Sequence, residues 1–137
     1  MPRLIFFLAA NSTSVDSRTN SLSIFEVIEQ LRSVAFPSRL HRADFVALWQ
    51  GQPGEQGQEF EQRIRVARPD HEEIADLKSP FKISGLRHRM IARLIDLPLA
   101  IPGIYQVELY VRPKGAEDWG LPVRVLPIPV NPAVSPE

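Results

Sequence analysis

Proline recurs along the whole chain and restricts the secondary structure that the chain can form. There are 13 prolines among the 137 residues, and they cut the sequence into short segments. Because proline lacks a backbone donor and clashes with the preceding helical turn, long helices cannot persist across this spacing. Short strands joined by turns can form instead. The proline spacing therefore predicts a mostly-β chain.

The clearest strand pattern covers residues 104–112, where apolar and polar side chains alternate. Period-two alternation gives a strand one buried and one exposed face, which is typical of an antiparallel sheet. Pro102 and Gly103 supply the turn before it. We expect residues 119–126 to form its hairpin partner. The expected inward residues are Tyr105, Val107, Leu109 and Val111 on the first strand and Leu121, Val123 and Val125 on the second.

Several other segments indicate strands: residues 4–10, a dense apolar run at 43–50, a looser alternation at 60–67, and residues 90–97. Residues 51–57 are rich in Gly and Pro and predict a loop. Together these segments predict an all-β antiparallel sandwich of about 7–8 strands, immunoglobulin-like or C2-like. We expect one β-sandwich domain over residues 1–127 and a Pro-rich flexible tail over residues 128–137.

Residues 22–32 leave an alternative open. Ile24, Val27, Ile28 and Leu31 follow the spacing of one helical face. Ser23 and Glu26 also have the spacing of a capping box. A helix here would make the domain α+β, whereas a strand would carry apolar residues on both faces, as a covered strand does.

A set of short motifs spans most of the chain. They are the apolar residues 4–10, Leu22-Ser23-Ile24, Phe36-Pro37, the apolar residues 45–48, Pro53-Gly54-Glu55 and Pro102-Gly103-Ile104-Tyr105. In this order the motifs resemble an uncharacterised bacterial family of small β-sandwich domains of unknown function. The resemblance implies a strand rather than a helix in residues 22–31, and it supplies no catalytic residues.

A second resemblance is to immunoglobulin-like sandwiches. Asp96 is followed by Gly103 and Tyr105 at the start of a strand, which is similar to the tyrosine corner. In that motif the Tyr hydroxyl bonds to the backbone just upstream. Val107 stands where those domains carry a Cys. The resemblance bears on architecture and implies no immune role.

The charge balance and the cysteine count exclude several functions. The formal net charge is +0, which argues against general binding of nucleic acid. Low net charge also gives little repulsion between copies, so we expect a protein partner or self-association. The chain has no cysteine, which excludes disulfides and thiolate catalysis and fits the cytoplasm. No apolar run is long enough to cross a membrane.

The chain has no pattern typical of an enzyme or a metal protein, so we expect neither catalysis nor a cofactor. No activated nucleophile beside a base is recognisable. His71 lies in the densest group of metal-ligating residue types, between Asp70 and Glu72, but the preceding Pro69 favours a turn.

Arginine is the one residue type with a functional bias. Arg87, Arg89 and Arg93 share one parity on a predicted strand, and Arg63 and Arg65 share one on another. If these strands were neighbours, the five side chains would form a basic face for phosphate or carboxylate groups. The alternative is a solvated face whose charge is offset by Glu59, Glu61 and Asp96.

Two aromatic residues are candidates for contact with a protein partner. Tyr110 points away from the core set of its strand, and Trp119 begins the next predicted strand. Aromatic residues are enriched at interface hot spots. The sequence as a whole favours a non-enzymatic binding or assembly module that acts through a sheet face, an edge strand or loops. The alternative is an accessory domain that recognises an anionic ligand through the arginine-bearing face.

Overall fold

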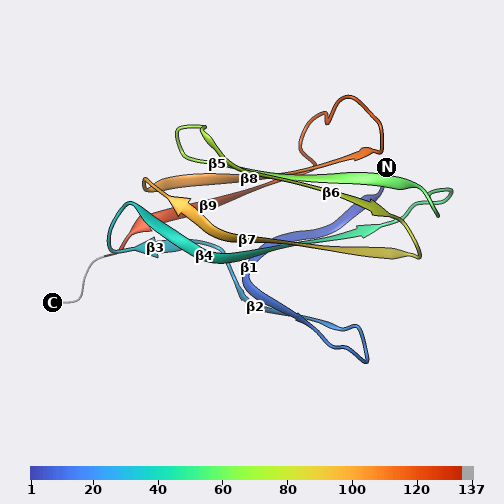
Figure 1. The fold of residues 1–137 in the computed structure, drawn as a ribbon, viewed down its shortest axis with the longest axis horizontal. Helices are drawn as coiled ribbons and strands as arrows, with labels where there is room; N and C mark the ends of the chain where they lie inside the picture. Colours follow the sequence, from blue (N-terminus) through green and yellow to red (C-terminus); the bar gives the residue numbers. More distant parts are fainter. Residues whose placement is uncertain (134–137) are drawn as a thin grey trace.

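Two β-sheets packed face to face make up the fold in the computed structural model, which describes residues 1–133 (Figure 1). The nine strands are β1 (Arg3–Val15), β2 (Leu22–Val27), β3 (Leu31–Ser33), β4 (Ser38–Gln50), β5 (Glu59–Ala67), β6 (Glu73–Lys82), β7 (Arg87–Leu99), β8 (Gly103–Pro113) and β9 (Arg124–Pro132). Sheet A has the order β2-β1-β4-β7, and sheet B has the order β3-β9-β8-β5-β6. All pairs are antiparallel except β3 with β9. The predicted all-β sandwich is therefore confirmed.

Residues 22–31 form no helix, so the α+β alternative is wrong. β2 pairs with β1 from Leu22 to Val27, and Glu26 interrupts it with a positive φ of 55°. Beyond this kink Ile28 enters the core, and Leu31 begins β3. The apparent helical spacing arose because two strands and the kink between them fall inside one short window. More generally, no helix among residues 1–133 could cross a membrane.

The core lies between the two sheets and follows the predicted alternation in β8 and β5. The inward residues of β8 are Tyr105, Val107, Leu109 and Val111, all buried. In the same core, Trp49 of β4 reaches across to sheet B, where its indole Nε1 donates to Gln62 Oε1 of β5 at 2.8 Å. A buried amide and a buried indole thereby satisfy each other.

The predicted partner of β8 is correct for residues 124–126, which pair with it, but the strand begins later and ends later than predicted, and its predicted inward face is wrong. The strand is β9, and Ile128 and Val130 are its buried residues, whereas Leu121 is 88% exposed and Val123 and Val125 also face solvent. Pro127 and Pro129 suggested the end of the fold, but proline is tolerated where a strand has a free edge. β3 pairs with β9 only from residue 130 to residue 132. Residues 128–132 therefore belong to sheet B and not to a flexible tail, and residues 134–137 lie outside the described part.

The turn before β8 has the hydrogen bond that a tyrosine corner implies. The hydroxyl of Tyr105 donates to the carbonyl oxygen of Ile101 at 2.7 Å. Gly103 has a φ of 133°, and a Cβ at this position would lie 2.7 Å from Cγ of Pro69. Glycine is needed there because any side chain would collide with the turn between β5 and β6.

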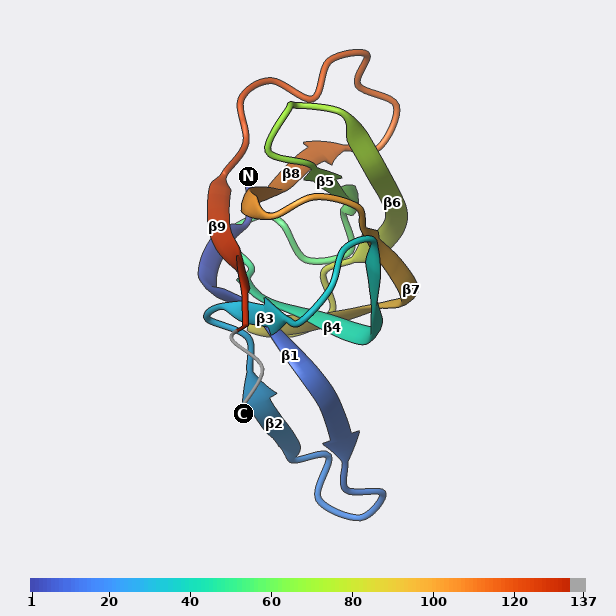
Figure 2. The same ribbon diagram turned by 90° about the vertical axis from the view of Figure 1, so that its left-hand side faces the viewer.

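β1 lies beside β4 for only part of its length. It pairs with β4 through Ala10, and beyond that residue it pairs with β2 alone. Residues 11–27 thus form a two-stranded hairpin that projects away from the sandwich (Figure 2). We call this hairpin the arm.

Candidate functional site

The tip of the arm is built by a local turn. The carboxylate of Asp16 accepts hydrogen bonds from the backbone N–H groups of Arg18 and Thr19, at 2.8 and 2.9 Å. These bonds hold the pKa of Asp16 below its ordinary value. Asp16 N also donates to Ser21 O at 2.9 Å, and Asn20 takes a φ of 60°, which asparagine tolerates well. The polar sequence between the two strands therefore encodes a closed hairpin.

The arm carries apolar side chains on both of its faces. In the register of β1 with β2, Val15 lies opposite Leu22 on one face, and Phe25 lies opposite Ser12 on the other. Opposite residues of an antiparallel pair share a face. Val15, Phe25 and Val27 are 44%, 51% and 50% exposed. The arm therefore leaves apolar area on both faces open to solvent.

A buried carboxylate holds the base of the arm to sheet A. Asp44 of β4 is 0% exposed and accepts from Thr13 Oγ1 at 2.8 Å. Arg42 donates to it through Nε and Nη2 at 3.1 and 2.8 Å, and Arg93 donates through Nε at 3.1 Å. The Arg42 guanidinium holds the pKa of Asp44 well below its ordinary value. Arg93 and Thr13 act in the same direction, against the effect of burial.

A second contact holds the tip of the arm. Arg89 of β7 donates from Nη2 to the carbonyl oxygen of Asn20 at 2.9 Å. The arm is therefore tethered at both ends to the outer face of sheet A, which is the face turned away from the core. These two contacts fix the arm in place.

The outer face of sheet A is apolar in its centre. Val46 of β4 is fully buried there, between Leu8 of β1 and Ile91 of β7 in the sheet register. The next row holds Phe6 and Leu48. β4 is thus apolar on both faces, as its dense sequence predicted for a central strand. The arm and this apolar band lie on the same side of the molecule.

The five predicted arginines do not form one face. Arg87, Arg89 and Arg93 lie on β7 in sheet A, and Arg63 and Arg65 lie on β5 in sheet B. The two groups are on opposite sides of the sandwich, so the prediction of a shared basic face is wrong. The sequence placed each group on one side of its strand but could not show which strands are neighbours.

Three of these arginines are already paired with carboxylates. Arg63 donates to both oxygens of Asp76 at 2.9 and 2.7 Å, and Arg65 donates to Glu73 at 2.6 Å. Arg93 is held by Asp44, as described above. The alternative prediction, that carboxylates offset the charge of these arginines, is thus correct for these three. The carboxylates are not the predicted Glu59, Glu61 or Asp96. The partners depend on cross-strand register, which sequence spacing alone does not define.

Two of the predicted arginines, Arg87 and Arg89, lack a carboxylate partner within residues 1–133. A further arginine, Arg3, lies near them, because the sheet register places Arg3, Gln50 and Arg87 in one row across the outer face of sheet A. Within the same described range, Arg3 has no ion pair either. We call Arg3, Arg87 and Arg89 the basic end of sheet A. Arg3 lies far from the other two along the chain, so no sequence pattern links it to them.

Tyr110 points away from the core, as predicted, but it is covered. It is 7% exposed, and the Trp119 ring packs edge-on against it with 6.5 Å between the ring centroids. The guanidinium of Arg63 lies 5.9 Å from the Tyr110 centroid, and that of Arg112 lies 3.9 Å from the Trp119 centroid. Tyr110 therefore contributes to packing on sheet B, and of the predicted pair only Trp119 is partly exposed to solvent.

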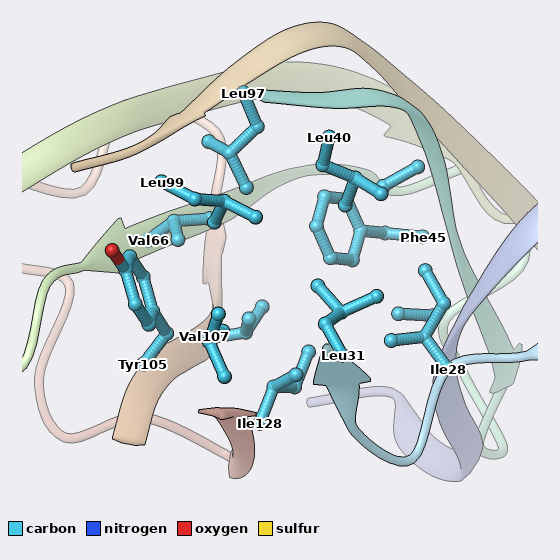
Figure 3. Close-up of a pocket in the computed structure, with 13 residues that line it drawn as sticks. Ile28, Leu31, Leu40, Phe45, Val66, Leu97, Leu99, Tyr105, Val107 and Ile128 are labelled. Carbon is cyan, nitrogen blue, oxygen red and sulfur yellow. The ribbon is translucent and has the colours of Figure 1, made fainter. Parts of the chain in front are cut away.

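One cavity lies inside the sandwich, near the end where β3 and β9 meet. Side chains including Phe45, Val107 and Ile128 surround it (Figure 3). It measures about 20 Å³, and its lining is apolar. No group that titrates near neutral pH converges on it, so it is a packing gap rather than a site for chemistry.

The acidic segment after β5 forms a turn, as predicted. Arg68 pairs with Asp70 and with Glu72, each at 2.9 Å, and His71 has a φ of 72°. No group of three or more His, Asp and Glu side chains in residues 1–133 could hold a metal ion.

The fold and its projecting arm define the class of protein: an all-β sandwich of two sheets whose outermost strand pair leaves the body as a hairpin. The chain belongs to a family of unknown function, because the model described as "Family of unknown function (DUF6941)" matches residues 5–126. The matched range includes the arm. This confirms the resemblance to a family of uncharacterised small β domains. No curated protein matches the chain.

Proposed function

We propose that this protein is a non-enzymatic binding or assembly module whose contact surface is the arm together with the outer face of sheet A. The observation that carries the proposal is the arm itself, which bears half-exposed apolar residues on both faces. Burial of apolar surface contributes about 25 cal/mol per Å². A partner that covers Val15, Phe25 and Val27 would therefore gain binding energy that the isolated chain cannot realise.

The tethering of the arm supports the same proposal. Thr13 is bonded to Asp44 at the base, and Arg89 is bonded to Asn20 at the tip. A contact surface that is already ordered loses less conformational entropy on binding than a mobile loop does. The contacts thus favour a preorganised docking element, and the cysteine-free sequence supports action in a reducing compartment such as the cytoplasm.

A double substitution on the arm tests the proposal. In Phe25→Lys/Val27→Lys, apolar area is lost and charge is added, so we expect association through the arm to weaken at least about tenfold. The measurement combines solution mass with quantitative capture of bound proteins from the source cells. Leu121→Lys is the matched control, because Leu121 is highly exposed on the sheet B side of the molecule. The proposal fails if neither self-association nor any captured protein depends on the arm.

A second candidate function is recognition of an anionic ligand by the basic end of sheet A. The observation that favours it is that Arg87 and Arg89 have no carboxylate partner within residues 1–133, whereas Arg63, Arg65 and Arg93 have one. The guanidinium group binds phosphate or carboxylate oxygens through paired hydrogen bonds. Such a ligand would bind beside the tip of the arm, where Arg89 already contacts Asn20.

Titration with inorganic phosphate and pyrophosphate tests this candidate. We expect binding to weaken with added salt, and to weaken at least about tenfold in Arg87→Ala/Arg89→Ala. Arg63→Ala should bind as the wild type does, because Arg63 lies in the other sheet. Binding that is absent from the wild type, or equal in the double variant, would exclude the anion site.

A further inference from the structure

The outer edge of β2 is an open strand edge at the border of sheet A. Within residues 1–133, β2 hydrogen-bonds to β1 on one side and to no strand on the other. We propose that β2 pairs antiparallel with β2 of a second copy of this chain, which joins the two arms into one four-stranded sheet. This inference rests on the proposed assembly function and names its partner.

The sequence of β2 sets its edge apart from the others. An exposed strand edge templates pairing with another chain unless it is shortened or blocked by lysine, proline or other charged residues. β2 contains Leu-Ser-Ile-Phe-Glu-Val, without proline, lysine or arginine. β6 carries Lys78 and Pro80, β7 carries Pro98, β9 carries Pro127 and Pro129 beside its free edge, and β3 has three residues. Among these edges, β2 is the least protected, because its only charged residue is Glu26 near its end.

The free edge of β1 in the arm is less suited to pairing. Its residues 11–15 read Asn-Ser-Thr-Ser-Val, and Thr13 is bonded to Asp44 of sheet A. The polar composition gives little cross-strand packing, and the contact with Asp44 keeps this side of the arm close to the body. β2 therefore offers the accessible edge.

The backbone of β2 points the required groups outward. Asp16 N donates to Ser21 O, so these residues form a hydrogen-bonded pair. Such pairs alternate along an antiparallel ladder, which directs the backbone groups of Ser23 and Phe25 toward β1. The N–H and C=O groups of Leu22 and Ile24 then face the open edge. They are the groups that a new strand would bond.

A two-fold axis at Ile24 gives a consistent pairing. Ile24 then lies opposite Ile24 of the second copy, and each provides an N–H and a C=O to the other. Glu26 is the only charged residue of β2, and it lies opposite Leu22 of the second copy rather than opposite another Glu26. Antiparallel pairing also brings the tip of each arm, with Arg18, toward the base of the other, with Glu26. The pairing therefore opposes no like charges and favours unlike ones.

Pairing with a second copy would add strands to the two-stranded arm. Two strands alone are marginal, whereas three or more with an apolar face are stable. In this pairing each arm adds two strands to the other, and the apolar faces become continuous across the axis, with the Phe25 side chains diagonal to each other. The net charge of +0 leaves little long-range repulsion between copies.

Single cysteine variants test the pairing directly, because the natural chain has no cysteine. Opposite residues of an antiparallel pair lie close enough for a disulfide. We expect Ile24→Cys to give a covalent dimer under mild oxidation, and Ser14→Cys, on the other strand of the same arm, to stay uncrosslinked. The unmodified protein should have twice the 15.5 kDa chain mass. Ile24→Lys should raise the dissociation constant at least about tenfold without loss of the folded circular dichroism spectrum.

The outcomes separate this inference from the proposed function. A dimer that crosslinks at residue 24 and dissociates in Ile24→Lys supports the pairing. A monomer at all concentrations, or a dimer that crosslinks at Ser14→Cys and not at Ile24→Cys, overturns it. If the monomer still captures another protein through the arm, and Phe25→Lys/Val27→Lys loses that capture, the assembly function stands while self-pairing fails.

Discussion

Replacing Asp44 with asparagine is expected to lower the free energy of unfolding by about 3 kcal/mol. The carboxylate is fully buried and binds Arg42, Arg93 and Thr13. An amide has one accepting oxygen and carries no charge, so it cannot accept from all three donors, and two guanidinium groups lose their anionic partner. Both arginines are partly exposed to water, which keeps the cost below that of a fully buried ion pair.

Chemical denaturation at neutral pH measures this loss, and Asp76→Asn is the matched control. Asp76 also pairs with an arginine but is partly exposed, so its substitution should cost about 1 kcal/mol or less. Equal effects of the two substitutions would contradict the account of the buried base of the arm.

The pH dependence provides a second measurement on the same residue. The pKa of Asp44 is depressed in the folded protein. The stability that its charge supplies is therefore present above the pKa of an unfolded aspartate, about 3.9, and is lost as the pH falls below that value. Asp44→Asn should lose less stability than the wild type between neutral and strongly acidic pH. Parallel curves for the two proteins would contradict this role.

Replacing Trp49 with phenylalanine is expected to cost about 3 kcal/mol. The substitution removes part of a fully buried ring and leaves the amide of Gln62 without its partner. The same bond joins β4 of sheet A to β5 of sheet B, so its loss weakens the contact between the layers. An unpaired buried amide accounts for a large part of this cost.

A second substitution separates the two contributions. Adding Gln62→Leu to Trp49→Phe should restore about 1 kcal/mol, because the amide that lacks a partner is removed. Trp119→Phe is the control, because Trp119 lies on the outer surface of sheet B, and it should cost about 1 kcal/mol or less. No recovery in the double variant would show that ring volume alone matters at Trp49.

The strands that were predictable from sequence are those whose own residues show a clear apolar pattern. The alternation of β8 and the dense apolar run of β4 each follow from side chains two residues apart along one strand. The predicted strand at 119–126 ends too early compared with β9, because prolines such as those at 127 and 129 are common where a domain ends. They are compatible with a strand because, among the described residues, that stretch of β9 pairs with β8 and with no second strand. This is a property of the sheet and not of the segment.

The candidate site was harder to predict because it depends on neighbours that are distant along the chain. The sequence predicts correctly that the arginines of β5 share one face of their strand and that those of β7 share one face of theirs. Whether the two groups lie near each other depends on which sheet each strand joins, and β5 and β7 join different sheets. Asp44 is the clearest omission. It stands inside an apolar run, where a lone carboxylate signals a buried partner, but its bonds to Thr13 and Arg93 depend on the bend of β1 away from β4.

Backbone hydrogen exchange in β2 tests the central claim most directly. At protein concentrations where the assembly forms, the amides of Leu22 and Ile24 should become protected to the same degree as those of Ser23 and Phe25, which already face β1. The protection at Leu22 and Ile24 should disappear on dilution and in Ile24→Lys, while that at the core strand β8 remains. Fast exchange at Leu22 and Ile24 under every condition in which the protein associates would show that the open edge of the arm is not its contact surface.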